Sequence, residues 1–327
     1  MARGASSSIL VVYAALVGNL LVALTKFIAA WWTGSSAMLS EAIHSLVDTV
    51  NQLLLLYGMN RAAQPPDELH PLGFGRELYF WSFIVALLMF TIGAGVTLLE
   101  GISHIRNPGE IVDPTVNYVV LAASMLFEGA TLAIALREFY KAKGETGFFE
   151  AVRRSKDPPS FIVLFEDSAA LIGLVIAFAG TYFAERLAMP VLDGVASIGI
   201  SLLLAVTALA LARESKELLI GEPASPRVRD SIVAIAKAQP NIERANVIFT
   251  VHLSPEEIVA TLSLEFADKL NTTQIEETVL ALEKAIHDEH PAITAVFVKP
   301  QTAHTFQARR HARRVRTRAS GKSVPAA

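Results

Sequence analysis

The feature that most constrains this chain is the length of its uncharged apolar segments. Residues 4–25 and 78–99 each run for 22 residues without a charged side chain. About 20 apolar residues are enough for a helix to cross the hydrocarbon core of a bilayer. Only 18% of the 327 residues are charged, whereas soluble domains carry about 25%. We therefore expect an α-helical membrane protein.

Further apolar segments before residue 221 predict six transmembrane helices. Cytoplasmic loops are enriched in Lys and Arg. Eleven basic residues fall on one side of the expected helices and two, Arg106 and Arg186, on the other. We thus expect a multi-pass protein of the bacterial cytoplasmic membrane with both termini in the cytoplasm. The expected helices cover residues 9–32, 36–60, 79–105, 115–138, 160–184 and 188–216.

After residue 220 the pattern becomes that of a small cytoplasmic α/β domain. Ser225 and Pro226 fit the N-cap and first position of a helix. Alternating apolar and polar residues predict a strand from Glu257 to Glu265. Thr273 and Glu276 have the spacing of a capping box. With strands at 245–253 and 293–298, the predicted order is αββαβ.

The predicted domains are therefore a transmembrane domain at 1–220, an α/β dimerisation domain at 221–300 and a basic tail at 301–327. The tail holds six Arg and one Lys without an acid. We expect it to be disordered, although contact with anionic lipid headgroups is also open. The rest of the chain carries a net charge of −10, which argues against nucleic acid as a partner.

Polar residues inside the expected membrane helices point to a function. A charge at mid-membrane costs about 2.5–3.5 kcal/mol, so its presence needs a reason. Residues Glu41, His44, Ser45, Asp48 and Gln52 recur at spacings of three and four, which places them on one helix face. His44 and Asp48, one turn apart, can hold one ion between them.

Asp167 is expected at a similar depth on the fifth helix, whose first turn we place at Pro158 and Pro159. From the helical rise, Asp48 lies about 15 Å and Asp167 about 12 Å from the cytoplasmic end of its helix. Two carboxylates repel in a low-dielectric site unless a proton or cation lies between them. Imidazole and carboxylates, in a chain without Cys, suit Zn²⁺, with Fe²⁺, Mn²⁺ and Co²⁺ left open. The structural alternative is that these groups only bond neighbouring helices.

At these positions the sequence resembles the cation diffusion facilitator (cation efflux) family. The resemblance rests on the segments 33–48, 70–77 and 166–173 and covers residues 9–300. It implies a homodimer that exchanges a divalent cation, most often zinc, for protons. It also implies an intramembrane site with two ligands on the second helix, here His44 and Asp48, and two on the fifth. The transported cation would be the only metal required.

One family ligand is missing here. The fifth-helix pattern is His or Asp followed four residues later by Asp. Asp167 fits the second position, but Val163 occupies the first. Glu166, Glu128 and the amide oxygen of Asn19 remain as substitutes.

Other polar residues are weaker candidates. His70 in a loop can bind a cation with Asp67 or Glu68, or form a hydrogen bond that orders the loop. We expect Lys26 to extend to the outer membrane interface. The positions that hold cytosolic metal in some relatives contain Asn246, Ser263 and Lys299. His287 and His290 can bind a metal at a helix end, although we expect a solvated helix terminus there, and His104 and His252 have no expected partner.

The resulting prediction is a proton-coupled divalent-cation exporter. The chain contains neither HExxH nor the phosphate-binding GxxxxGK[ST] pattern, so neither a metalloenzyme nor an ATP-driven pump is expected. The alternatives are transport of Mn²⁺, Fe²⁺ or Co²⁺ by the same mechanism, or an ion-sensing membrane receptor or scaffold.

Overall fold

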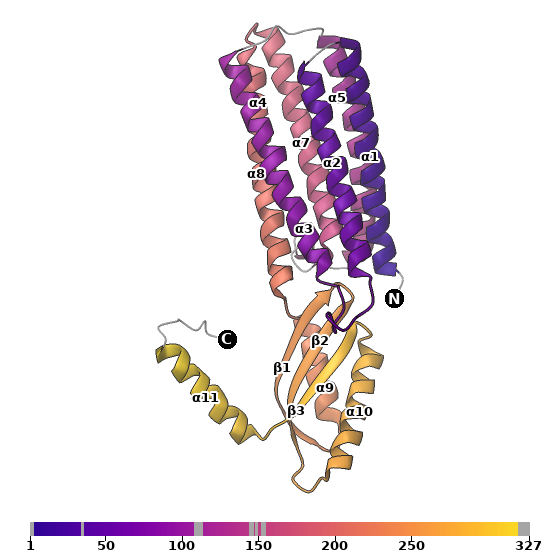
Figure 1. Cartoon of the computed structure of the whole chain (residues 1–327), viewed down its shortest axis with the longest axis vertical. Coiled ribbons are helices and arrows are strands. Elements are labelled where there is room, and N and C mark those ends of the chain that lie inside the picture. Colours follow the sequence, from indigo (N-terminus) through magenta and orange to yellow (C-terminus); the bar gives the residue numbers. More distant parts are fainter. Residues whose placement is uncertain are drawn as a thin grey trace. The chain divides into compact units, whose positions relative to one another are not determined.

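The chain divides into two compact units, Met1–Ile220 and Gly221–Ala327 (Figure 1). The computed structural model describes residues 3–33, 36–107, 114–143, 147, 150–151 and 155–319.

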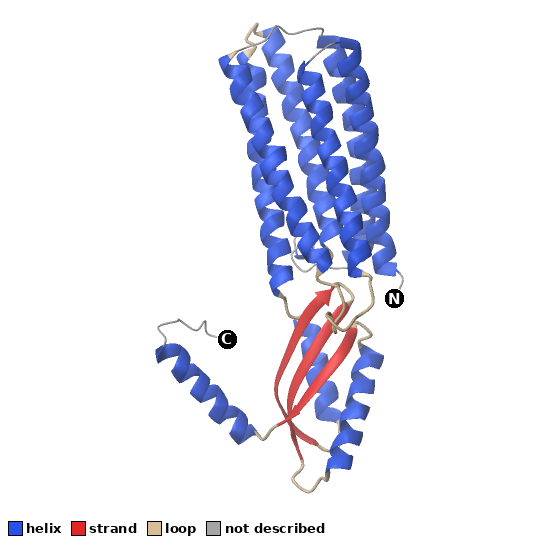
Figure 2. Ribbon diagram, in the orientation of Figure 1, coloured by secondary structure: helices blue, strands red, loops and turns tan. Residues whose placement is uncertain are grey.

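The first unit is a bundle of long helices that run side by side (Figure 2). Its third long helix is continuous from Glu77 to Arg106 and contains a π-helical segment. The helices are α1 (Arg3–Thr33), α2 (Ser36–Ala62), α3 (Glu77–Leu88), the π segment η1 (Met89–Ala94), α4 (Gly95–Arg106), α5 (Pro114–Lys143), α7 (Pro158–Arg186) and α8 (Val191–Ile220).

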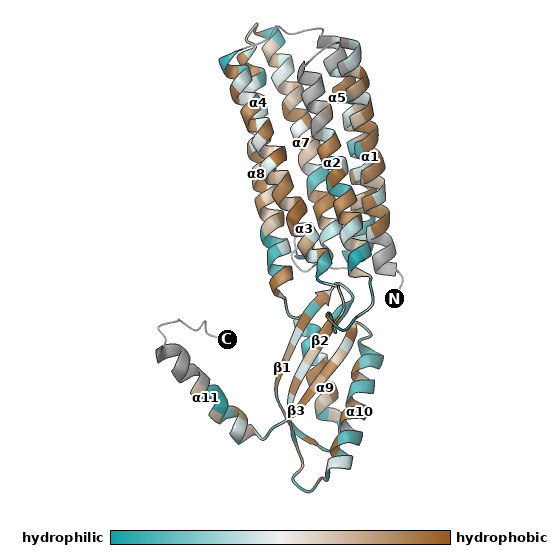
Figure 3. Ribbon diagram, in the orientation of Figure 1, coloured by the Kyte–Doolittle hydropathy of each residue, from teal (hydrophilic) through white to brown (hydrophobic). Residues whose placement is uncertain are grey.

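Five helical segments in the described part of the chain are long and apolar enough to cross a membrane. They belong to α1, to the continuous helix α3–η1–α4, and to α5, α7 and α8. The helix α2 has 27 residues but is more polar, and teal positions interrupt it in Figure 3. The prediction of six transmembrane helices is thus supported for five.

The π segment η1 is held against α8. A π-helical turn leaves backbone carbonyls without their usual helical partners. The hydroxyl of Ser201 donates to the carbonyl oxygen of Ala94 at 2.9 Å. Just beyond, Gly101 and Gly194 let the two backbones meet, because a Cβ on Gly194 would lie 2.8 Å from the carbonyl oxygen of Gly101. These contacts fix α4 on α8.

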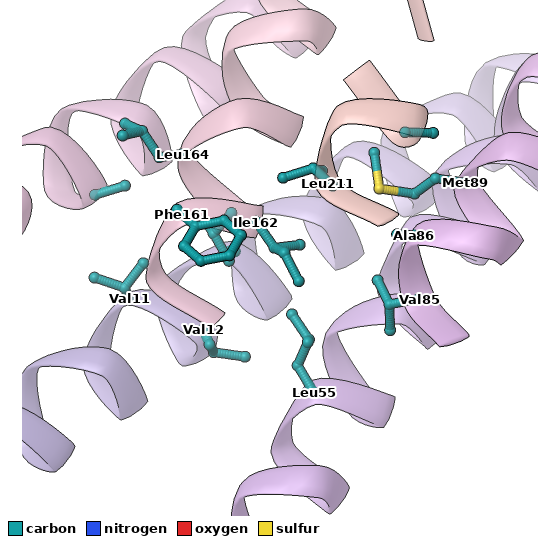
Figure 4. Packing of buried hydrophobic residues seen from close by; sticks show 14 of the residues in the cluster. Val11, Val12, Leu55, Val85, Ala86, Met89, Phe161, Ile162, Leu164 and Leu211 are labelled. Carbon is teal, nitrogen blue, oxygen red and sulfur yellow. The ribbon is translucent and has the colours of Figure 1, made fainter. Parts of the chain in front are cut away.

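The bundle is packed around α7. This helix begins at Pro158, with Pro at its first position, as expected from the sequence. Phe161 and Ile162 pack against Leu55 of α2 and against residues of α1, α3 and α8 (Figure 4). Val163, at the position of the missing ligand, is fully buried in the same apolar cluster.

The second unit contains a three-stranded sheet in the order β1-β2-β3. β1 pairs antiparallel with β2, and β2 parallel with β3. The predicted order αββαβ is confirmed. The elements are α9 (Pro226–Ala238), β1 (Ile242–Ser254), β2 (Glu257–Phe266), α10 (Thr272–Glu289), β3 (Ile293–Pro300) and a further helix, α11 (Ala303–Ala319).

The alternation in β2 gives the sheet one buried face. Ala260, Leu262 and Leu264 are fully buried and pack with Ile232 of α9 and Leu282 of α10. The two helices therefore cover this face. On the opposite face of the sheet, Thr261 pairs with Phe249 of β1 and Phe297 of β3, and both rings are exposed.

Two local expectations for this unit were wrong. The capping box of α10 is formed by Asn271 and Gln274, not by Thr273 and Glu276. Asn271 is an equally good N-cap residue, and its use starts the helix two residues earlier. The tail is not disordered from residue 301, because α11 is helical from Ala303, where Ala, Arg and Gln favour a helix.

Candidate functional site

A cavity of about 200 Å³ lies within the helical unit. Its lining combines apolar residues with polar groups from six of the helices. Two groups of charged residues line it, one from α1, α2, α5 and α7 and the other from α4 and α8. The charged lining residues are Lys26, Asp48, Glu100, His104, Glu128, Glu166 and Asp193.

Part of the predicted polar face of α2 lines the cavity. Ser45 and the half-buried Asp48 line it, and Gln52, one turn further, is fully buried. The side chains of His44 and Glu41 lie outside the described residues. The role of His44 as a ligand therefore stays a prediction.

On α7, two adjacent carboxylates take different positions. Glu166, rather than Asp167, lines the cavity. Its Oε2 accepts a 2.7 Å hydrogen bond from Nε2 of Gln52, which joins α7 to α2. Asp167 is only 1% exposed, and its carboxylate lies beside the side chain of Thr131 on α5. Glu166 is thus the fifth-helix carboxylate that reaches the cavity.

The predicted carboxylates nevertheless form one electrostatic group. The negative charge of Asp48 is close enough to repel those of Glu128, Glu166 and Asp167. Glu128 of α5 is buried and lines the cavity. Asn19 of α1 is buried, but the cavity wall on α1 is formed by other residues.

Lys26 of α1 was assigned wrongly from the sequence. It does not extend to the interface but is 6% exposed and lines the cavity. Its Nζ donates to Oγ of Ser45 at 2.9 Å. The spacing of polar residues on α2 provides this partner, but the sequence does not reveal that α1 presents Lys26 to it.

At the other group of charged residues, His104 has a partner that we did not expect. Its Nδ1 lies 3.4 Å from Oδ2 of Asp193 on α8, while Glu100 lies one turn earlier on α4. Thr181 of α7 also donates to Asp193, at 3.4 Å. The close approach of α4 and α8 at their glycines explains why these groups meet.

His70 orders its loop and does not line the cavity. Its backbone N–H donates to Oδ1 of Asp67 at 2.6 Å, and its ring Nδ1 lies 3.1 Å from the same oxygen. Desolvation is the largest single effect and raises the pKa of Asp67, but the hydrogen bonds from His70 and Leu69 and the attraction to His70 together outweigh it and hold the pKa below its usual value. This geometry agrees with the loop-ordering alternative.

The second unit uses its presumed metal positions differently. Nδ2 of Asn246 donates to the backbone oxygen of Gln301 at 2.7 Å, and Ser263 donates to Oε1 of Gln301 at 3.2 Å. Both residues thus anchor the segment that leads into α11. Nowhere in the described part of the chain do three or more His, Asp or Glu side chains form a group that could hold a metal ion; the side chain of His44 lies outside that part.

The helical unit matches a known transporter domain. Residues 12–220 fit the profile of the cation efflux transmembrane domain. The chain belongs to the cation efflux family. This confirms the resemblance to the cation diffusion facilitators. The members of this family are transporters. The prediction that the protein is not an enzyme is thereby confirmed.

Individual relatives extend the match. The chain is 33% identical over 265 residues to the mitochondrial proton-coupled zinc antiporter SLC30A9 of Mus musculus, covering 80% of this chain and 47% of the relative. It is 35% identical over 210 residues to metal tolerance protein C4 of Arabidopsis thaliana, covering 63% and 46%. It is 26% identical over 279 residues to the cation-efflux pump FieF of Cronobacter sakazakii, covering 85% and 87%. The chain thus spans about half the length of SLC30A9 and C4.

Proposed function

We propose that this protein exports divalent cations, zinc first among them, in exchange for protons. The observation that carries the proposal is the cavity of the helical unit, which is lined by the carboxylates of Asp48, Glu128 and Glu166. Several carboxylates on one cavity within a membrane are costly unless protons or a cation compensate their charges. The relatives named as a zinc antiporter and a cation-efflux pump support the same class of activity.

The proposed ligands are His44, Asp48 and Asp167, with Glu166 in place of the ligand missing at Val163. The hydrogen bond from Gln52 to Glu166 supports this substitution, because metal-binding carboxylates are commonly oriented by such partners. The imidazole and carboxylates suit Zn²⁺, while Mn²⁺, Fe²⁺ and Co²⁺ are the alternatives for the same site.

The proposed cycle follows from this charge arrangement. The deprotonated site binds the metal ion from the cytoplasm, and α2 and α7 then shift relative to their neighbours until the site opens outward. Protons from outside displace the ion and return inward on the same groups. His44 is the natural proton carrier, because the reference pKa of histidine is about 6.5.

The proposed arrangement in the membrane has six spans, with α2 as the sixth. It places both termini in the cytoplasm, on the evidence of the basic loop residues, and the protein in a bacterial cytoplasmic membrane. We also propose a homodimer formed by the second unit. The exposed rings of Phe249 and Phe297 beside Thr261 support this, because they leave one sheet face with an apolar row.

Transport into vesicles tests the proposal. The purified full-length chain is reconstituted into liposomes that contain a zinc-sensitive dye and an acidic interior. Zinc should accumulate against its gradient only while the pH gradient persists, and the Asp48→Ala variant should not accumulate it. The same assay with Mn²⁺, Fe²⁺ and Co²⁺ identifies the preferred ion. Binding of zinc without proton-driven accumulation would favour an ion-sensing receptor or scaffold instead.

A further inference from the structure

Lys26 is a buried cation inside a helix that is apolar enough to span a membrane. It is 6% exposed and belongs to the candidate span Ser8–Ala29. A charged side chain in this environment is costly unless neighbouring groups compensate it. Its compensation therefore has to come from the residues that surround it in the bundle.

Two of those residues, Asp48 and Glu166, are proposed ligands of the transported cation. Lys26 lines the cavity together with Asp48, Glu128 and Glu166. The carboxylate of Glu128 lies within electrostatic range of its ammonium group. The ammonium also donates to Ser45 at 2.9 Å, on the α2 segment between His44 and Asp48. A protein cation and a metal ion would thus share one set of anions.

We infer that Lys26 is a tethered cation that competes with the transported metal ion for the carboxylates of this cavity. The inference rests on the proposed function and adds the residue that limits how tightly the metal is held. Two cations in a low-dielectric cavity repel each other. Because a transport site must bind its ion and then release it, such a competitor favours release.

The structural alternative is that Lys26 only ties α1 to α2 through its hydrogen bond with Ser45. The two roles respond differently to substitution. Lys26→Met keeps the length of the side chain and removes both charge and donor, whereas Lys26→Arg keeps the charge. Ser45→Ala removes the hydrogen-bond acceptor and leaves the charge in place.

The test is the equilibrium affinity of the purified full-length chain for Zn²⁺, measured by calorimetry in detergent. Lys26→Met should bind zinc about tenfold or more tightly than the unmodified chain, because a repulsion between close charges is removed. Lys26→Arg and Ser45→Ala should bind with nearly unchanged affinity. Size-exclusion chromatography confirms that each variant is folded, and Lys26→Gln, with the same expectation, replaces Lys26→Met if that variant does not fold.

Equal or weaker binding by Lys26→Met would overturn the inference, as would equal tightening by Lys26→Arg. The Asp48→Ala variant separates this result from a failure of the proposed function. If Asp48→Ala loses binding while Lys26→Met gains none, only the role of Lys26 is refuted. If Asp48→Ala binds zinc normally, the proposed site itself is wrong.

Discussion

Replacing Gln52 by Leu tests whether Glu166 supplies the fourth ligand. Gln52 is fully buried in α2, and its Nε2 donates to Oε2 of Glu166 at 2.7 Å. Leu has a similar volume without the amide. The substitution therefore removes the hydrogen bond between α2 and α7 and leaves the surrounding packing largely intact.

The expected size of the effect follows from this contact. A hydrogen bond to a charged group contributes about 1.5–3 kcal/mol. At 1.4 kcal/mol for each tenfold change in affinity, this corresponds to about 10- to 150-fold. Loss of a residue that orients a metal ligand costs about 10- to 100-fold in metal affinity. If Glu166 binds the metal, Gln52→Leu should thus weaken zinc binding by about 10- to 100-fold.

The assay is zinc binding by calorimetry on the purified chain, with transport measured in parallel. Thr49→Val is the matched control, because Thr49 is also buried on α2 but donates within its own helix, to the backbone oxygen of Ser45. Glu166→Gln should weaken binding at least as much as Gln52→Leu. The double variant should be no weaker than Glu166→Gln alone, because the two residues act through one contact.

Two results would refute this reasoning. Normal zinc affinity in both Gln52→Leu and Glu166→Gln would show that Glu166 is not a ligand. An equal loss in Thr49→Val would show that any buried polar change on α2 disturbs the site, and that the bond to Glu166 has no special role.

Three further predictions concern the site and the second unit. Asp48→Ala or Asp167→Ala should abolish proton-driven zinc transport while membrane insertion stays normal; near-normal transport would place the ion path elsewhere. Removal of residues 222–327 should weaken dimerisation, seen by light scattering, while transport per inserted molecule persists. Asn271→Ala should lower the free energy of unfolding of the second unit by about 1 kcal/mol, measured by thermal unfolding. Thr273→Ala should leave that free energy nearly unchanged, because Thr273 is not the N-cap residue.

The sequence predicted the elements well where one physical rule dominates. Helix positions followed from uninterrupted apolar length, and the start of α7 followed from Pro158. Burial of Ala260, Leu262 and Leu264 followed from their alternation. The π segment from Met89 to Ala94 was not predictable in this way. Its stability depends on a contact with Ser201 of α8, far away in the chain.

The sequence predicted which residues belong to the candidate site better than it predicted how the helices orient them. Spacing placed Asp48 on the polar face of α2, but it could not determine how α1 and α7 rotate toward that face. Glu166 and Asp167 differ by about 100° around their helix, and only packing decides which one reaches the cavity. The same holds for Lys26, whose partner Ser45 lies on another helix.

The polarity of α2 connects the fold with the proposed function. The residues that make α2 less apolar than the other long helices include Asp48 and Gln52, the same ones that supply or support the site. Lipid alone therefore favours this helix less than its neighbours. Its hydrogen bonds to Lys26 of α1 and Glu166 of α7 provide partners inside the bundle. If α2 and α7 shift relative to their neighbours as proposed, the bond between α2 and Lys26 of α1 is the one that has to break.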